Sequence, residues 1–245
     1  MAECSEPKLS YRAENNSERT VPFDRVRVRD LTAARPWRTL RWYRGQPHYA
    51  GMYWSATMEG HVVYESRLEL ARLLLADFDA GVVSIAAQPF QLTTRVDGRP
   101  RRHVPDFLLL DRSGLASVVD VKPAGLITEP KVAKTLAWAG GLIEAHGWRF
   151  EVWSGCDGTL LKNVRFLAGY RRPSLFDHDF VAMVLSTVSD GDSIEAVEQR
   201  LATRHPAHTV RPALLHLLWR CVLSADLNQT LTGTTTLRQT HERAA

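Results

Sequence analysis

Cysteine is scarce in this chain of 245 residues. The three cysteines, Cys4, Cys156 and Cys221, lie far apart in the sequence. Neither a disulfide framework nor a zinc knuckle is therefore expected, because both need closely spaced or paired cysteines. This cysteine usage is typical of a protein that works in a reducing cytoplasm.

Long apolar runs are also missing. No uncharged apolar stretch reaches the roughly 18 residues that a membrane-spanning helix needs. The first residues, MAECSEPKLSYRAENNSERT, lack the apolar region of a secretory signal. The chain has neither a Walker A loop nor a G-x-G-x-x-G segment, which argues against nucleotide binding. We expect a soluble cytoplasmic protein with no membrane partner.

The chain carries a mild excess of basic charge. Its formal net charge is +4 and its pI is about 9.1, which permits a nucleic-acid partner without establishing one. Residues 31–58 contain no acidic residue, and tryptophan and tyrosine alternate there with Arg35, Arg38, Arg41 and Arg44. Arginine with aromatics can hold a phosphate backbone and stack on bases. A packed surface ribbon with solvated arginines explains the same pattern equally well.

The spacing of apolar residues predicts a mixed α/β core. Residues 1–30 are polar and predict a flexible arm, which we extend as a basic arm to residue 40. A helical pattern over 61–79 places Glu65 and Glu69 on one face. A second helix is expected over 130–146, where Lys131 and Lys134 lie one turn apart. Short apolar runs predict strands at 82–86, 90–96, 107–110, 117–121 and 148–153.

The hairpin predicted within residues 102–123 carries the residues of chemical interest. Side chains at i and i+2 of a strand share a face, so Asp120 and Lys122 should project together. If Asp106 lies opposite them, two carboxylates and an ammonium converge. Such a group, with the Val121 carbonyl and a helical glutamate, could hold Mg²⁺ and activate a water. Lys122 would orient or deprotonate that water, or stabilise the transition state.

Basic residues surround this hairpin. Arg101 and Arg102 precede Pro105, and together with Lys131 and Lys134 they could attract a phosphodiester. A charged hairpin tip is the alternative interpretation of the arginines.

The C-terminal residues predict a separate module. Arg171 to Ser174 has the composition of a boundary. Helices are expected over 176–188, 193–202 and 211–223, followed by a small β-wing within 225–237. Three helices and a wing suggest a winged-helix-like module, which often contacts DNA. A plain helical oligomerisation module remains the alternative.

Two short motifs give the sequence a family resemblance. Pro105-Asp106 followed by Asp120-Val121-Lys122 resembles the PD-(D/E)xK pattern of nucleases. The chain is more closely similar to TnsA-like endonuclease subunits of heteromeric transposases, over residues 60–153 and again over 210–226. The resemblance also rests on Glu65–Glu69, Asp79, Val82 and Gln88–Phe90.

The resemblance implies a restriction-endonuclease-like fold, a mixed central sheet flanked by helices, over residues 41–172. A helical or winged-helix domain would occupy residues 173–245. Asp106 and Lys122 match the family's catalytic positions, and Asp120 matches the acidic position of the general motif. Glu69 matches the helical glutamate, with Glu65 as its rival one turn away.

The implied activity is a Mg²⁺-dependent endonuclease, with Mn²⁺ as a substitute. It would cut the 5′ strand at transposon ends during cut-and-paste transposition, in association with the nucleoid. The implied partners are transposon-end DNA, a DDE-type TnsB-like transposase and an AAA+ TnsC-like ATPase. Two alternatives stay open, namely a stand-alone restriction or repair nuclease and a non-catalytic DNA-binding assembly subunit.

Overall fold

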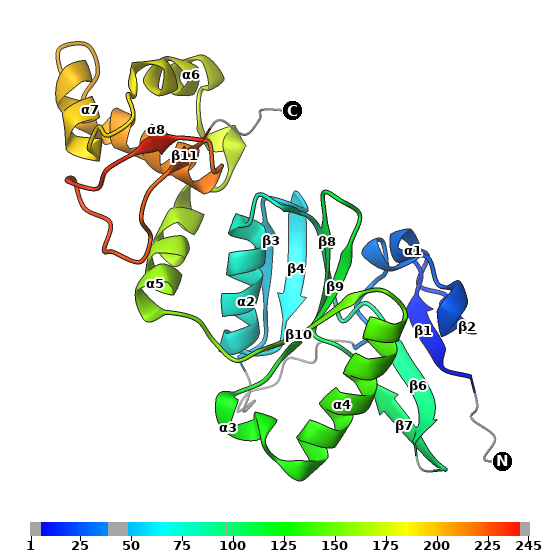
Figure 1. The fold of residues 1–245 in the computed structure, drawn as a ribbon. Helices are drawn as coiled ribbons and strands as arrows, with labels where there is room; N and C mark the ends of the chain where they lie inside the picture. The colour runs from blue at the N-terminus through cyan, green and yellow to red at the C-terminus, as the bar shows by residue number, and fades with distance from the viewer. Residues whose placement is uncertain (1–5, 39–48, 97, 241–245) are drawn as a thin grey trace. The chain divides into compact units, whose positions relative to one another are not determined.

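The computed structural model describes residues 6–38, 49–96 and 98–240. The chain forms two compact units. The first comprises residues up to Asp77 and Gly81–Gly155, and the second comprises Phe78–Ala80 and the residues from Cys156 onward. Both helices and strands are present throughout the first unit, as the sequence predicted for a mixed α/β core (Figure 1).

The central sheet of the first unit has the strand order β10-β9-β8-β5. Its strands are β5 (Val82–Ala87), β8 (Phe107–Asp111), β9 (Ala116–Val121) and β10 (Arg149–Trp153). β8 is antiparallel to both β5 and β9, whereas β9 and β10 are parallel. The parallel pair needs a long crossover, which α3 (Ala124–Ile127) and α4 (Pro130–Ala145) provide. The predicted β8–β9 hairpin is confirmed.

Helix α4 packs closely on the central sheet. An added Cβ at Gly140 would lie 2.6 Å from Phe150 Cδ1 on β10, so only glycine permits this approach. Ile143 of α4 is fully buried in a cluster with Leu108 of β8 and Val118 of β9. This face of the sheet therefore carries the main core of the unit.

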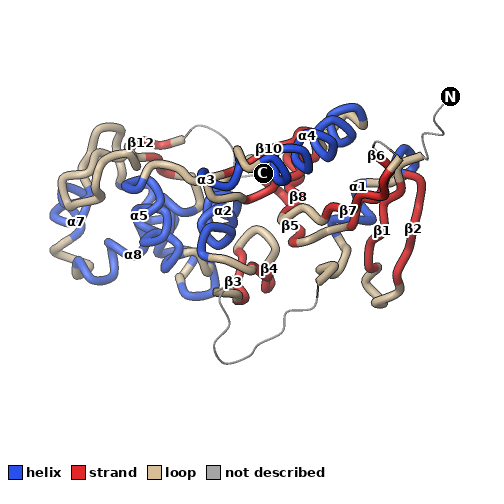
Figure 2. Tube along the Cα trace, turned by 90° about the horizontal axis from the view of Figure 1, so that it is seen from below, coloured by secondary structure: helices blue, strands red, loops and turns tan. Residues whose placement is uncertain are grey.

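A second sheet has the order β2-β1-β6-β7, and its strands lie together in Figure 2. They are β1 (Lys8–Arg12), β2 (Glu18–Pro22), β6 (Gln91–Val96) and β7 (Arg99–His103). The prediction of a flexible N-terminal arm is wrong for residues 6–38, because β1 pairs with β6 and buries Leu9 and Tyr11. Leu9 and Tyr11 are two residues apart, as on one face of a strand, but the polar residues around them made this pattern too weak to predict a strand.

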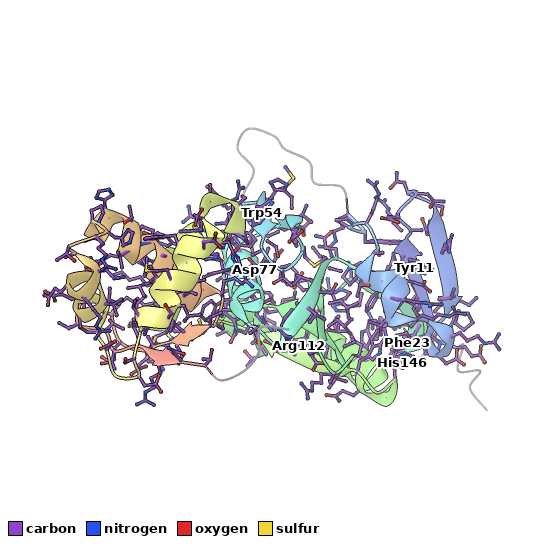
Figure 3. The ribbon with its side chains drawn as sticks, turned by 90° about the horizontal axis from the view of Figure 1, so that it is seen from above. Tyr11, Phe23, Trp54, Asp77, Arg112 and His146 are labelled. Atoms are coloured by element: carbon purple, nitrogen blue, oxygen red, sulfur yellow. The ribbon has the colours of Figure 1, made fainter. Side chains whose placement is uncertain are left out.

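Two short helices continue this N-terminal segment, η1 (Phe23–Arg25) and α1 (Val28–Thr32). Phe23 stacks on His146 with ring centroids 4.5 Å apart, and the two residues lie next to each other in Figure 3. Leu31 of α1 is fully buried in the same core. The segment is therefore an integral layer of the first unit.

The helix predicted over 61–79 is shorter than expected. β3 (Gly51–Ser55) and β4 (Gly60–Tyr64) form a hairpin, and α2 runs from Arg67 to Phe78. The β-branched Val62 and Val63 favour the strand. Ser66 starts the helix because its Oγ accepts the Glu69 N–H at 3.1 Å. Near the other end of α2, buried Asp77 accepts hydrogen bonds from the β3–β4 hairpin (Figure 3).

The second unit is mostly helical. Its elements are α5 (Gly158–Leu167), η2 (Ala168–Tyr170), η3 (Pro173–Leu175), α6 (His178–Thr187), α7 (Ile194–Leu201), α8 (Ala207–Trp219), β11 (Leu223–Ser224) and β12 (Arg238–Gln239). β11 and β12 pair across the region predicted as a wing. α8 begins before the predicted residue 211 and contains Pro212.

The boundary between the units follows Gly155 and not residue 172 as predicted. The reason is that α5 belongs to the second unit, where the Asn163 side chain donates to the Leu227 and Gln229 carbonyls. Within the described residues, no helix is long and apolar enough to cross a membrane.

Candidate active site

The β8–β9 hairpin brings Asp106 and Asp120 together. Phe107 pairs with Val119, so Asp106, one residue before β8, lies beside Asp120 near the end of β9. The Asp106 N–H donates to the Val119 carbonyl at 3.0 Å, which continues the ladder past the last paired residue. The convergence expected from the strand period is therefore present. Asp106 is 7% exposed and Asp120 is fully buried.

Lys122 places its ammonium among three oxygens. Its Nζ lies 3.0 Å from Asp106 Oδ2 and 3.6 Å from Asp120 Oδ1, and it donates to the Val121 carbonyl at 3.1 Å. Burial alone would lower the pKa of this ammonium, but the two carboxylates outweigh burial and raise the pKa above its ordinary value. Lys122 is therefore positively charged at neutral pH.

Opposing effects act on the pKa of Asp106. Burial raises the pKa of its carboxyl, the Lys122 ammonium lowers it, and the nearby Asp120 raises it again, so that the net pKa is raised. The Val121 N–H donates to Oδ2 at 2.6 Å, on the same oxygen that faces Lys122. The backbone of β9 thus fixes the orientation of the Asp106 carboxylate.

His103 is a further member of the site; the sequence indicated it only as part of the basic run before Pro105 and not as a catalytic or metal-binding residue. It ends β7, in the second sheet, and its Nε2 lies 2.7 Å from Asp120 Oδ2. Its ring packs edge-on against Trp138 of α4, with centroids 6.0 Å apart. The signal available in the sequence was positional, because His103 continues the alternation of Arg99 and Arg101 along one strand face.

The two candidate glutamates are in different surroundings. Glu65 forms an ion pair with Arg38, with 2.9 Å between Oε2 and the guanidinium. Glu69 is 9% exposed and accepts hydrogen bonds from the Glu65 N–H and the Ser66 hydroxyl. Burial, followed by the charge of Asp106, raises the pKa of Glu69 to about 7. Glu69 is therefore the glutamate that is electrostatically coupled to the aspartate site.

A basic groove lies between β7 and α4. It has a volume of about 820 Å³ and includes Trp138, the residue that contacts His103. Four cationic side chains line it, namely Arg99, Arg101, Lys131 and Lys134. Three of these were predicted to bind DNA. The groove gathers them on one surface, and Trp138 connects that surface to the aspartate site.

Among the described residues, the other arginines predicted to bind DNA, namely Arg35, Arg38 and Arg102, do not line this groove. Arg102 occupies the alternate face of β7 and is not among the residues that line it. The Arg35 Nε donates to the Glu14 carbonyl at 2.7 Å, and Arg38 pairs with Glu65. Arg41 and Arg44 lie outside the described residues.

The donor atoms fit a divalent cation in part. Among the described residues, no group of three or more His, Cys, Asp or Glu side chains is arranged to hold a metal ion. Both Asp120 oxygens are nevertheless buried, and within the described structure they accept no hydrogen bond. Mg²⁺ needs only one or two carboxylates, with waters completing its coordination. Asp120, Asp106 and the Val121 carbonyl supply such a set.

Comparison with known proteins does not assign a function, so the assignment has to rest on the chemistry of this site. No family model and no curated protein matches this chain. The feature that any proposed function has to explain is a buried aspartate pair with a charged lysine, placed next to a groove lined by arginine and lysine.

Proposed function

We propose that this chain is a metal-dependent DNA endonuclease, a phosphodiester hydrolase that uses Mg²⁺ with Mn²⁺ as a substitute. The observation that carries the proposal is the position of Lys122 Nζ, which faces Asp106, Asp120 and the Val121 carbonyl at the end of one hairpin. Buried carboxylates beside an ammonium are costly to assemble unless they serve a site.

The architecture supports a restriction-endonuclease-like core. The site residues are on the central hairpin of a mixed sheet, β9 continues through α4 into the parallel strand β10, and α2 precedes the sheet with Glu69 in its first turn. Sequence motif and fold position therefore agree for the aspartates, the lysine and the glutamate.

The roles of the residues follow from their charges. Asp106, Asp120 and the Val121 carbonyl would hold the cation. When bound, the cation supplies an acidified water and neutralises charge on the phosphate. Lys122, being protonated, is suited to donate hydrogen bonds to a phosphate oxygen and not to act as the base. In the reaction, a water molecule releases a proton to solvent as its oxygen bonds to phosphorus, the bond to the leaving sugar oxygen breaks, and that oxygen takes up a proton from solvent.

The basic groove supports DNA as the substrate. Its four cations are spaced along β7 and α4, and each can neutralise a backbone phosphate. Because Trp138 of the groove also packs on His103, a strand held there would pass close to the aspartates.

We further propose that the nuclease is a TnsA-like subunit of a heteromeric transposase that cuts the 5′ strand at transposon ends. The support is the run of motif residues from Glu65 to Lys122. In this setting a DDE-type transposase cuts the other strand and an AAA+ ATPase regulates assembly. A stand-alone restriction or repair nuclease is the alternative that the same core supports.

The C-terminal unit supports an assembly role in preference to base readout. Three helices and the β11–β12 pair are compatible with a winged-helix-like module. Helix α8, however, is buried from Ala213 to Trp219. The exposed residues of α7 include Glu195 and Gln199, and its Arg200 pairs with Asp192. A surface of this kind suits a protein partner better than a DNA groove.

A cleavage assay tests the proposal. Transposon-end DNA would be incubated with the chain and its transposase partners, comparing wild type with Asp106→Ala, Lys122→Ala and the second-unit control Lys162→Ala. Loss of 5′-strand cutting only in the first two variants is expected. Unchanged cutting in both would refute the site, and cutting of ordinary duplex by the chain alone would favour the stand-alone nuclease. Binding of DNA without any cutting by wild type would favour the non-catalytic subunit.

A further inference from the structure

The contact between His103 and Asp120 is not an ordinary ion pair. The two atoms are 2.7 Å apart, the His103 side chain is 9% exposed and Asp120 is fully buried. Within the described residues, however, neither Nε2 of His103 nor either oxygen of Asp120 has a hydrogen-bond partner. At so short a distance the cause is angular, because a proton on Nε2 would not point at the carboxylate oxygen.

This arrangement of His103 and Asp120 is unfavourable unless a cation lies in contact with both residues. The buried ring nitrogen and the buried carboxylate oxygens are left without hydrogen-bond partners within the described structure, and unsatisfied buried polar groups are costly. Lys122 offers only partial relief, since its Nζ is 3.6 Å from the other oxygen of Asp120. A cation in contact with both Nε2 and Oδ2 would satisfy the two atoms together.

The separation of the two atoms suits a shared cation. Ligands at about 2.1 Å in octahedral geometry lie about 3.0 Å apart when they are adjacent in the coordination sphere. The observed 2.7 Å is close to that spacing. Trp138 holds the imidazole edge-on from α4, as a ligand ring needs to be held if it is to keep one orientation.

We propose that His103 is a nitrogen ligand of the divalent cation that Asp120 binds, and that it raises the affinity of the site for Mn²⁺ relative to Mg²⁺. The inference rests on the proposed metal-dependent function and specifies which side chain sets the relative affinity of the site for the two cations. Mg²⁺ is a hard cation that prefers oxygen ligands, whereas first-row transition cations accept imidazole more readily. An aspartate site with one imidazole therefore shifts the preference toward the transition cations.

Direct metal binding tests this proposal without any activity assay. Free Mn²⁺ would be measured by electron paramagnetic resonance during titration of the DNA-free protein, with Mg²⁺ added as competitor. The variants are His103→Ala, His103→Asn and Asp120→Asn, with His61→Ala on β4 as the exposed histidine control. Circular dichroism melting without metal would show that each variant is folded.

Loss of a ligand is expected to weaken Mn²⁺ binding about ten-fold or more in His103→Ala, while His61→Ala stays like wild type. His103→Asn, which offers an oxygen, should retain Mg²⁺ binding and lower the ratio of Mn²⁺ affinity to Mg²⁺ affinity. Unchanged Mn²⁺ affinity and selectivity in both His103 variants would overturn the role of His103 alone. If wild type binds neither cation, or if Asp120→Asn binds both as well as wild type, the metal site of the proposed function fails too.

Discussion

Lys122 Nζ lies 3.0 Å from Asp106 Oδ2, and this contact places a positive charge among oxygens that a metal ion would also use. The ammonium stabilises the buried aspartates when no cation is bound. The protonated lysine can act as a hydrogen-bond donor but not as a base. Burial lowers its pKa, but the two carboxylates outweigh burial and keep the pKa above the ordinary value.

Replacing Lys122 with Met should abolish cleavage and also destabilise the metal-free protein. The physical reason is that two buried carboxylates would lose their counter-charge, a change that costs about 3 kcal/mol in comparable buried pairs. Urea unfolding in EDTA measures the effect. The double variant Asp106→Asn with Lys122→Met should regain much of the stability while remaining inactive. A Lys122→Met protein as stable as wild type would contradict this account.

Glu69 should make stability fall as pH rises. The folded protein holds the Glu69 proton up to a pKa of about 7, against 4.5 for the ordinary carboxyl. Between these values the unfolded chain binds fewer protons, so the free energy of unfolding decreases with rising pH, by roughly 3 kcal/mol in total. Glu69→Gln keeps the capping oxygen and should flatten this slope, as measured by unfolding in EDTA from pH 4.5 to 8.

The matched control for that experiment is Glu65→Gln. Glu65 lies one helical turn before Glu69 and pairs with the exposed Arg38. Its charge is the smallest of the contributions that raise the pKa of Glu69, so Glu65→Gln should change the slope far less than Glu69→Gln does. Equal slopes in wild type and Glu69→Gln would show that Glu69 is not the protonated glutamate.

The basic groove should contribute to DNA affinity through phosphate contacts. Arg101→Ala and Lys134→Ala are each expected to weaken binding uniformly across sequences, and each should reduce the salt slope of the binding constant by about 1. Fluorescence anisotropy at several salt concentrations measures both quantities. Arg19→Ala, on the exposed strand β2 of the same sheet, serves as the charge-matched control and should leave the slope unchanged. Equal losses in all three variants would argue for nonspecific attraction in place of a groove.

The two adjacent glycines of α4 should respond in opposite directions. A Cβ at Gly140 would lie 2.6 Å from the Phe150 ring, whereas a Cβ at Gly141 has no atom within 4 Å. Gly140→Ala is therefore expected to cost about 1–3 kcal/mol through overpacking. Gly141→Ala should stabilise the helix by about 0.5–1 kcal/mol.

Thermal and urea unfolding compare the two glycine variants. Adding Phe150→Leu should recover part of the loss in Gly140→Ala, since it removes the ring from the contact. Similar stability changes at both positions would mean that α4 does not pack on β10 through Gly140.

The local parts of the site were predictable from the sequence. A tight hairpin and the two-residue strand period are enough to bring Asp106, Asp120 and Lys122 together, because these residues lie close to one another in the sequence. The choice between the glutamates was also encoded nearby. Ser66 caps α2 and hydrogen-bonds to the Glu69 side chain. The strand residues 61–64 were predicted as helix, and this hid the position at which the helix begins.

The parts that were missed depend on pairings between distant segments. His103 reaches Asp120 from a different sheet, so no spacing within the motif could indicate it. The N-terminal strand β1 lies between its hairpin partner β2 and the distant strand β6, and only the pairing with β6 joins it to the rest of the sheet. The second unit begins at Cys156 because Asn163 bonds to the backbone of residues 227 and 229, a contact that composition does not reveal.

The pairing of β1 with β6 has a consequence for how the chain is made. β1 pairs with the adjacent β2 along its whole length, and its other edge aligns Lys8 with Thr93 and Leu9 with Leu92 of β6, so that second edge has no partner until β6 has also left the ribosome. Until then its apolar residues stay open to solvent or to a chaperone. A truncated chain without residues 1–25 would leave the edge of β6 uncovered, and exposed strand edges of this kind promote association between molecules.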